Sequence, residues 1–263
     1  MPVLLVRPPA SSLAQGQITH IAAPSDVSFP KAQEQWANYV KIFAEREWAL
    51  IPVPRDDSCP DSVFIEDSIV VFGDMAVIAS PGAETRKAEI GPVETTVKER
   101  LPGLKLHRIE LPGTLDGGDV LKVGKTIYVG RSSRTNDEGI KQLADIVGNE
   151  GYEVKAIPTT KALHLTESAI TALPDGTIIG YEPIVDDTSL FPSFVAVPEP
   201  EGVAVVVLGE NDVLMSAAAP KTREMLVQRG LNVTTAEISE FEKLEGCVTC
   251  LSVRVRDEDI KPE

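Results

Sequence analysis

Residues 62–79 read SVFIEDSIVVFGDMAVIA and predict a β-hairpin. The two apolar runs, Ser62–Val71 and Met75–Ala79, are separated by the turn signal Phe-Gly-Asp. A helix is predicted over Arg86–Leu101, because a Pro-Gly pair follows directly and ends it. Leu104–Ile109 has the composition of a further strand. The stretch therefore defines a unit of two strands, a helix and a third strand.

The same unit is predicted again along the rest of the chain. The second copy consists of Asp119–Val123, Thr126–Val129, a helix from about Thr135 to Val147 and Tyr152–Ile157. The third copy has the strands Ala169–Leu173 and Thr177–Gly180, and a loop replaces its helix because of Pro192 and Pro198. The fourth copy consists of Val203–Leu208, Val213–Met215, a helix at about Lys221–Gly230 and Asn232–Ala236.

A fifth unit requires the two ends of the sequence to meet. Val248–Val255 would pair with Val3–Val6, followed by a helix at about Lys31–Arg46 and a strand at Trp48–Val53. Five units of about 45–50 residues indicate an α/β fold that closes as propellers do. The alternative is an ordinary α/β sheet in which the spacing arises by chance. We expect one catalytic domain spanning residues 1–263.

Composition limits the classes of function. The chain has 263 residues, 25 Lys+Arg against 40 Asp+Glu, a net charge of −15 and 43% apolar residues, so wholesale disorder is excluded. This acidity disfavours nucleic acid as a partner. The longest apolar runs are far shorter than the ~18 residues of a membrane span. The three cysteines, Cys59, Cys247 and Cys250, cannot all pair within the chain, which favours a reduced, cytoplasmic protein.

Two groups of acids stand out. Glu66 and Asp67 lie in an otherwise apolar run, where carboxylates must either face water or hold a cation. Asp116 begins Asp-Gly-Gly-Asp, whose glycines permit a tight turn or bulge. His164 lies between leucines, where a histidine is more often part of a core than a catalyst, although it can exchange protons near neutral pH.

The pair Cys247 and Cys250 allows three interpretations. A structural zinc site needs four ligands, and the sequence has no second closely spaced pair. A thioredoxin-like dithiol needs its first cysteine at a helix N-terminus, whereas this motif leads into a predicted strand. The third interpretation is a single nucleophile, Cys250, with a histidine as its acid and base.

Carboxylates beside a thiol and a histidine suit one substrate class well. A guanidinium group is planar and permanently charged, and it pairs with carboxylates through two parallel hydrogen bonds. Its carbon is a poor electrophile, so fixing its nitrogens with acids would hold that carbon in front of the sulfur. The residues therefore favour a cationic guanidino substrate.

Six segments carry a family resemblance, in the order Pro60–Asp67, Pro81–Arg86, Leu115–Asp119, Arg134–Asn136, Leu163–Leu165 and Gly246–Ser252. Together they resemble the motifs of the dimethylarginine dimethylaminohydrolases, a family of the guanidino-modifying pentein superfamily. The resemblance covers nearly the whole chain, from the first strand to Val255. It implies a five-bladed α/β propeller of ββαβ-type units.

The resemblance also implies roles for individual residues. The catalytic set would be Cys250 as nucleophile, His164 as general acid and base, and Asp116 as the acid that partners the histidine. The substrate-binding set would be Asp61, Glu66 and Asp67 around the guanidine, Arg86 and Arg134 at the amino-acid end, the Leu244 carbonyl at the α-amino group and Gln17 on a flap. No metal or cofactor is implied, and we expect a monomer or homodimer.

The implied activity is hydrolysis of Nω-methylated arginines to citrulline and methylamine or dimethylamine. Two departures from the family pattern, Thr166-Glu167-Ser168 and Ala204-Val205-Val206, concern substrate choice rather than the catalytic set. The alternatives are a pentein that hydrolyses arginine or citrulline, and a catalytically silent binding protein of the same fold.

Overall fold

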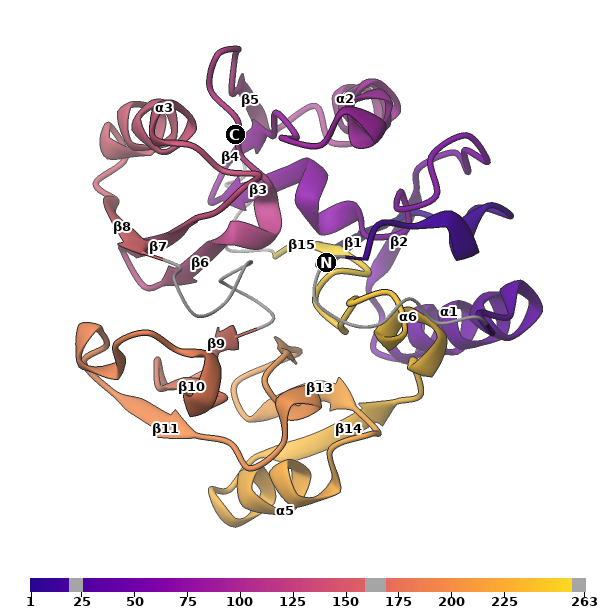
Figure 1. Ribbon diagram of the computed structural model, residues 1–263, viewed down its shortest axis with the longest axis vertical. Helices are drawn as coiled ribbons and strands as arrows, with labels where there is room; N and C mark the ends of the chain where they lie inside the picture. The colour runs from indigo at the N-terminus through magenta and orange to yellow at the C-terminus, as the bar shows by residue number, and fades with distance from the viewer. Residues whose placement is uncertain (19–25, 159–168, 257–263) are drawn as a thin grey trace.

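The computed structural model describes residues 1–18, 26–158 and 169–256. Over these residues the strands form five three-stranded sheets around a common centre, with the long helices outside them (Figure 1). Each sheet pairs two strands antiparallel and adds a third strand parallel to the middle one. The predicted five-unit α/β propeller is therefore confirmed.

The elements follow the predicted order. The first sheet contains β15 (Val253–Val255), β1 (Val3–Val6) and β2 (Ala49–Pro52), with helix α1 (Phe29–Ala44). The second contains β3 (Ile69–Phe72), β4 (Met75–Ile78) and β5 (Lys105–Arg108), with α2 (Ile90–Arg100). The third contains β6 (Val120–Val123), β7 (Thr126–Arg131) and β8 (Glu153–Pro158), with α3 (Asp137–Gly148). The fourth contains β9 (Ile170–Ala172), β10 (Ile178–Gly180) and β11 (Phe194–Ala196). The fifth contains β12 (Val205–Val207), β13 (Asp212–Ser216) and β14 (Asn232–Ala236), with α5 (Pro220–Gln228).

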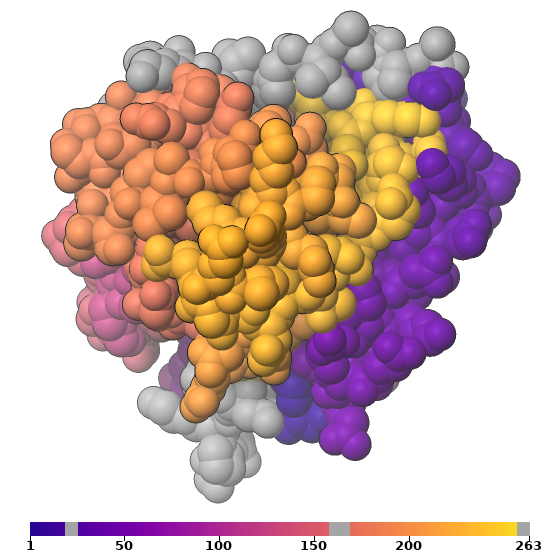
Figure 2. Space-filling view, turned by 90° about the horizontal axis from the view of Figure 1, so that it is seen from below, coloured from indigo at the N-terminus to yellow at the C-terminus, as the bar shows by residue number. Residues whose placement is uncertain are grey.

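The ring closes between the two ends of the sequence, as expected. Strand β1 pairs antiparallel with β15, and Val3 lies opposite Val255. Figure 2 shows the yellow C-terminal segments packed beside the indigo and purple N-terminal ones. Residues 248–252 form a turn ahead of β15, so the strand is shorter than predicted.

Two predicted elements differ in detail. The run Ser62–Val71 is not one strand, because Ile65–Ser68 forms a 3₁₀ helix, η2, and the strand begins at Ile69. An apolar run alone does not distinguish a strand from a buried helical turn. The predicted helix Arg86–Leu101 is divided into a 3₁₀ segment, η3 (Glu84–Glu89), and α2.

No α-helix forms in the described residues between β10 and β11, as predicted for the third copy, but Pro192 and Pro198 flank strand β11, which was not predicted. Between β10 and β11 the chain has two short 3₁₀ turns, Glu182–Ile184 and Thr188–Leu190. In contrast, α3 begins sharply because the Asn136 side chain accepts a hydrogen bond from the Gly139 amide at 2.8 Å. This cap fixes the loop that carries Arg134.

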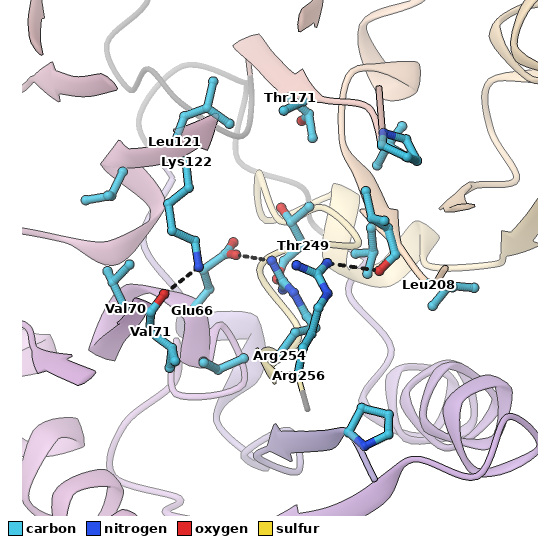
Figure 3. A pocket seen from close by; sticks show the side chains of 18 of the residues that line it. Glu66, Val70, Val71, Leu121, Lys122, Thr171, Leu208, Thr249, Arg254 and Arg256 are labelled. Atoms are coloured by element: carbon cyan, nitrogen blue, oxygen red, sulfur yellow. Dashed lines mark hydrogen bonds and ion pairs between the residues drawn. The ribbon is translucent and has the colours of Figure 1, made fainter. Parts of the chain in front are cut away.

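The first strand of every unit faces the centre of the ring. Residues of β3, β6, β9, β12 and β15 line a cavity of about 870 Å³ (Figure 3). This is the central cavity of the ring. Among the described residues, no helix has the length and apolar character needed to cross a membrane.

Candidate active site

Two short 3₁₀ helices pack together and place most of the acids. Helix η4 (Gly117–Asp119) lies directly against η2, so closely that a Cβ on Gly117 would stand 2.1 Å from the Glu66 carbonyl oxygen. The Gly118 amide donates to Asp67 Oδ1 at 3.0 Å. Glycine at both positions therefore allows the backbone contact that brings Asp67 near Asp116.

Arg86 is the cation at the centre of this group. Its side chain is only 2% exposed, and it forms ion pairs with Asp67 and with Glu89, the latter at 2.8 Å. Its Nη2 also donates to the backbone carbonyl oxygens of Asp61 and Phe64 at 3.2 and 2.9 Å. The guanidinium thus ties η3 to the segment that carries the acids.

The charges of these groups influence one another strongly. Burial opposes ionisation of Asp67, but the Arg86 and Arg134 guanidinium groups lower its pKa. Burial and then the Asp67 carboxylate raise the pKa of Asp116 to about 7. The Arg86 and Arg134 guanidinium groups oppose this rise.

Asp116 is held by a network that includes Arg134. Its Oδ2 lies 3.5 Å from Arg134 Nη1, and its Oδ1 accepts from the Gly82 amide at 3.3 Å. The Asp116 amide donates to Thr135 Oγ1, whose hydroxyl donates to Asp119 at 2.6 Å. These bonds fix the carboxyl group at the junction of the second and third sheets.

Cys250 lies in the turn that precedes β15. Its carbonyl oxygen accepts a hydrogen bond from the Glu66 amide at 3.3 Å, which joins the thiol segment to η2. Its Sγ lies 3.2 Å from Cys247 Sγ. The hydrogen bond with Cys247, burial and the nearby Glu66 and Asp67 carboxylates all raise the pKa of the Cys250 thiol.

Gln17, expected on a flap, contacts Asp61. The Gln17 amide donates to both carboxylate oxygens of Asp61, at 3.1 and 3.2 Å. The Gln17 side chain donates to Thr85 Oγ1 at 2.7 Å, so it contacts η3 beside Arg86. Burial raises the pKa of Asp61, although Arg86 opposes this effect. Leu244 is buried, three residues before Cys247, at the end of helix α6 (Ser239–Glu242).

Adjacent acids face different sides of the site. Asp67 pairs with Arg86, whereas Glu66 Oε1 accepts from Arg254 Nη2 at 2.9 Å. Glu66 and Arg254 lie together at the central cavity, near Lys122 (Figure 3). A single turn of 3₁₀ helix therefore separates the acid group from the central cavity.

The structure brings together eight of the ten residues expected from the sequence, while Leu244 is buried and no hydrogen bond among the described residues joins it to the others. Asp61, Asp67, Asp116, Arg86 and Arg134 form one network, Cys250 joins it through Glu66, and Gln17 covers Asp61. His164 and the departure at residues 166–168 lie outside the described residues. Among the described residues, no group of three or more His, Cys, Asp or Glu side chains is arranged to hold a metal ion.

Two residues of the network were not expected. Glu89 is buried beside Arg86, and the i, i+3 spacing of Arg86 and Glu89 could have indicated the pair. Arg254 lies between two valines of β15, and a charge in a buried strand could have indicated a buried partner.

Comparisons with known proteins agree with this geometry. The chain is 51% identical over 253 residues to the N(G),N(G)-dimethylarginine dimethylaminohydrolase of Streptomyces coelicolor, covering 96% of both proteins. It is 34% identical to the enzyme of that name from Pseudomonas aeruginosa, covering 95% of this chain and 98% of the relative. No family model matches the chain.

Solved structures have the same fold. A cysteine-to-serine mutant of the Pseudomonas aeruginosa enzyme in complex with citrulline superposes with a TM-score of 0.86 at 32% identity, covering 96% of this chain and 98% of the other. The N-terminal domain of the cyanobacterial arginine dihydrolase ArgZ superposes with a TM-score of 0.85 at 20% identity, which shows the shared fold alone.

Fold and site together define the class, a pentein α/β propeller of the guanidino-modifying type with a thiol among buried carboxylates. Within that class, the chain belongs to the dimethylarginine dimethylaminohydrolase family.

Proposed function

We propose that the protein hydrolyses Nω-methylated arginines, such as asymmetric dimethylarginine and monomethylarginine, to citrulline and dimethylamine or methylamine. It is then a hydrolase of C–N bonds in linear amidines. The observation that carries the proposal is the Glu66 amide hydrogen bond that holds the Cys250 segment against the acid-bearing helix η2, in a chain 51% identical to a dimethylarginine dimethylaminohydrolase. The cysteines, none of which is disulfide-bonded, support a reduced compartment such as the cytoplasm.

The chemistry requires a thiolate and a mobile proton. In the first step Cys250 Sγ attacks the guanidinium carbon, and the C–N bond to the methylated nitrogen breaks as His164 protonates the departing amine. A covalent thiouronium remains on sulfur. His164 then takes a proton from water, whose oxygen attacks the same carbon, and the C–S bond breaks to give citrulline. Asp116 would orient His164, and the buried acids would hold the guanidinium nitrogens.

The direct test is incubation of the purified protein with asymmetric dimethylarginine, arginine and citrulline as separate substrates. Citrulline formation from dimethylarginine, with stoichiometric dimethylamine, is the expected result. Ammonia release from arginine or citrulline at a higher kcat/KM would instead identify one of the other pentein hydrolases. Binding without turnover of any of the three would indicate a binding protein.

Removing the Asp61 charge is expected to weaken substrate recognition. Asp61→Asn keeps the shape of the side chain and leaves an oxygen for the Gln17 amide. A hydrogen bond to a charged group contributes roughly 1.5–3 kcal/mol, so kcat/KM for dimethylarginine should fall about 10- to 150-fold. Asp57→Asn removes an exposed carboxylate paired with Arg55 and serves as the matched control. An unchanged kcat/KM in Asp61→Asn would refute the assignment.

A bound guanidinium is expected to ionise the thiol. The hydrogen bond with Cys247, burial and the Glu66 and Asp67 carboxylates raise the pKa of Cys250, and burial and the two carboxylates are still present when Cys247 is replaced. A cation at 4 Å contributes roughly 4 kcal/mol at an effective dielectric of 20, and even ~1.4 kcal/mol at the sulfur lowers its pKa by about one unit. Thiolate absorbance is measured against pH with and without an inert alkylguanidine. The Cys59→Ser/Cys247→Ser variant is used because it leaves Cys250 as the only cysteine. A thiol already ionised below pH 7 without ligand would contradict this mechanism.

A further inference from the structure

The candidate nucleophile has a second thiol in contact with it. The Sγ atoms of Cys247 and Cys250 lie 3.2 Å apart, and both residues are half-buried thiols rather than a disulfide. Hydrolysis as proposed above uses Cys250 alone. The function therefore leaves Cys247 without a chemical role, although its sulfur is in direct contact with the attacking atom.

The local structure favours bond formation between these two sulfurs. A disulfide bond is about 2.05 Å long, so the sulfurs need to approach by about 1.1 Å from their 3.2 Å separation. The turn between them is fixed from outside the pair, because Tyr39 donates to the Val248 carbonyl oxygen at 2.8 Å. The Glu66 amide holds the Cys250 carbonyl at 3.3 Å. The turn therefore keeps the two sulfurs close to bonding distance.

The two sulfurs also differ in ionisation. The hydrogen bond with Cys250 lowers the pKa of Cys247, and the contact with Thr249 Oγ1 at 3.0 Å acts in the same direction. The pKa of Cys250 is raised. Because the thiolate is the form that reacts with oxidants, Cys247 is the more reactive member of the pair in the unliganded protein.

We propose that Cys247 and Cys250 form a site of reversible oxidative modification, in which a peroxide converts the contacting thiols into a disulfide. The Cys247 thiolate attacks one peroxide oxygen, the O–O bond breaks, and the departing hydroxide takes a proton and leaves as water. Cys247 is then a sulfenic acid. Cys250 Sγ attacks the Cys247 sulfur, its proton leaves with the hydroxyl group as a second water, and the S–S bond forms. Two thiols and one hydrogen peroxide thus yield one disulfide and two waters.

This modification has a defined consequence for the site. The disulfide occupies the sulfur that would attack the guanidinium carbon, so the oxidised protein cannot turn over. It also prevents Cys250 from reaching the sulfinic and sulfonic acids, which dithiothreitol does not reverse. The effect on activity rests on the proposed function, whereas disulfide formation does not.

The cross-link can be measured without any substrate. The protein is treated with hydrogen peroxide, alkylated without reduction and digested with trypsin. The peptide Leu244–Arg254 contains both cysteines and should lack two hydrogens and carry no alkyl group. Cys59, whose Sγ contacts Asp56 and Ser58, lies in a different peptide and should remain an alkylated thiol. Sulfinic acid on Leu244–Arg254 in place of the cross-link would overturn the proposal.

Activity then distinguishes the roles of the two thiols. The wild type should lose turnover with peroxide and recover it fully with dithiothreitol. Cys247→Ser, or Cys247→Ala if the serine variant does not fold, should lose turnover about tenfold more slowly, because the reactive thiolate is absent. It should also recover less after reduction. Equal rates of inactivation in wild type and variant, with equal recovery, would overturn the proposal. A protein that forms the cross-link but shows no turnover before oxidation would refute only the proposed function.

Discussion

Replacement of Cys250 by serine is expected to abolish turnover of dimethylarginine. Serine keeps the size of the side chain, but a hydroxyl group has a far higher pKa than a thiol and is a much weaker nucleophile toward a guanidinium carbon. Loss of an essential nucleophile leaves a residual rate lower by about 10⁴-fold or more. Cys247→Ser should retain most of the turnover, because Cys247 Sγ contacts Cys250 but has no place in the proposed steps.

Two further measurements on Cys250→Ser and Cys247→Ser separate loss of chemistry from loss of substrate binding. Substrate binding should persist in Cys250→Ser, as measured by calorimetry with dimethylarginine, since the acid network does not include the sulfur. Rapid quenching of the wild type should give a protein mass increased by the thiouronium group, which Cys250→Ser should lack. Equal loss of turnover in both variants would indicate instead that the two sulfurs act together, as a dithiol or in metal binding.

Arg86→Ala is expected to reduce the free energy of unfolding by about 3–5 kcal/mol. The guanidinium is 2% exposed and pairs with Asp67 and Glu89, so alanine would leave the buried Glu89 carboxylate without its partner and Asp67 with Arg134 as its nearby cation. It would also remove the donors for the Asp61 and Phe64 carbonyl oxygens. Urea denaturation followed by far-UV circular dichroism measures the difference.

The neighbouring residue is a matched control for Arg86. Lys87 pairs with Glu84 on the exposed face of the same 3₁₀ segment, and Lys87→Ala should change stability by less than about 0.5 kcal/mol. The family resemblance implies that Arg86 holds the amino-acid end of the substrate. The Arg86→Ala variant could instead keep wild-type stability and lose only the discrimination between arginine derivatives and simple alkylguanidines. In that case Arg86 binds the amino-acid end of the substrate and does not stabilise the fold.

Spacing along the chain predicted the fold well where strands and turns carry local signals. The strand Asn232–Ala236 was predicted with the same bounds as β14. The described part of the third unit lacks an α-helix between β10 and β11, as predicted, but its strand β11 between Pro192 and Pro198 was missed. The run from Ser62 was wrongly predicted to be one strand. An apolar run of this length fits a strand and a buried 3₁₀ turn equally well, so the sequence could not distinguish them. The fold of that turn depends on η4, which packs on it from the next unit.

The sequence indicated which residues lie close together better than it indicated how their side chains are arranged. The sequence indicated that Glu66 and Asp67 must face water or hold a cation, and each pairs with an arginine. It did not indicate that these adjacent acids face opposite sides, because Arg86 and Arg254 are brought to them from different units of the ring. Glu89 likewise acquires its role only when η3 folds against the acids.

The pairing of β1 with β15 determines when the site can be completed during synthesis. The ribosome makes the N-terminal part first, so β1 exists long before its partner Val253–Val255 emerges. Cys250 lies just ahead of that partner strand and is among the last described residues to emerge. The nascent chain therefore carries Asp61, Asp67 and Asp116 well before Cys250 is made. Protection from hydrogen exchange of the β1 amides on the edge that pairs with β15, as distinct from the edge that pairs with β2, should appear only in chains long enough to expose β15 outside the ribosome. Earlier protection would show that another segment covers this edge first.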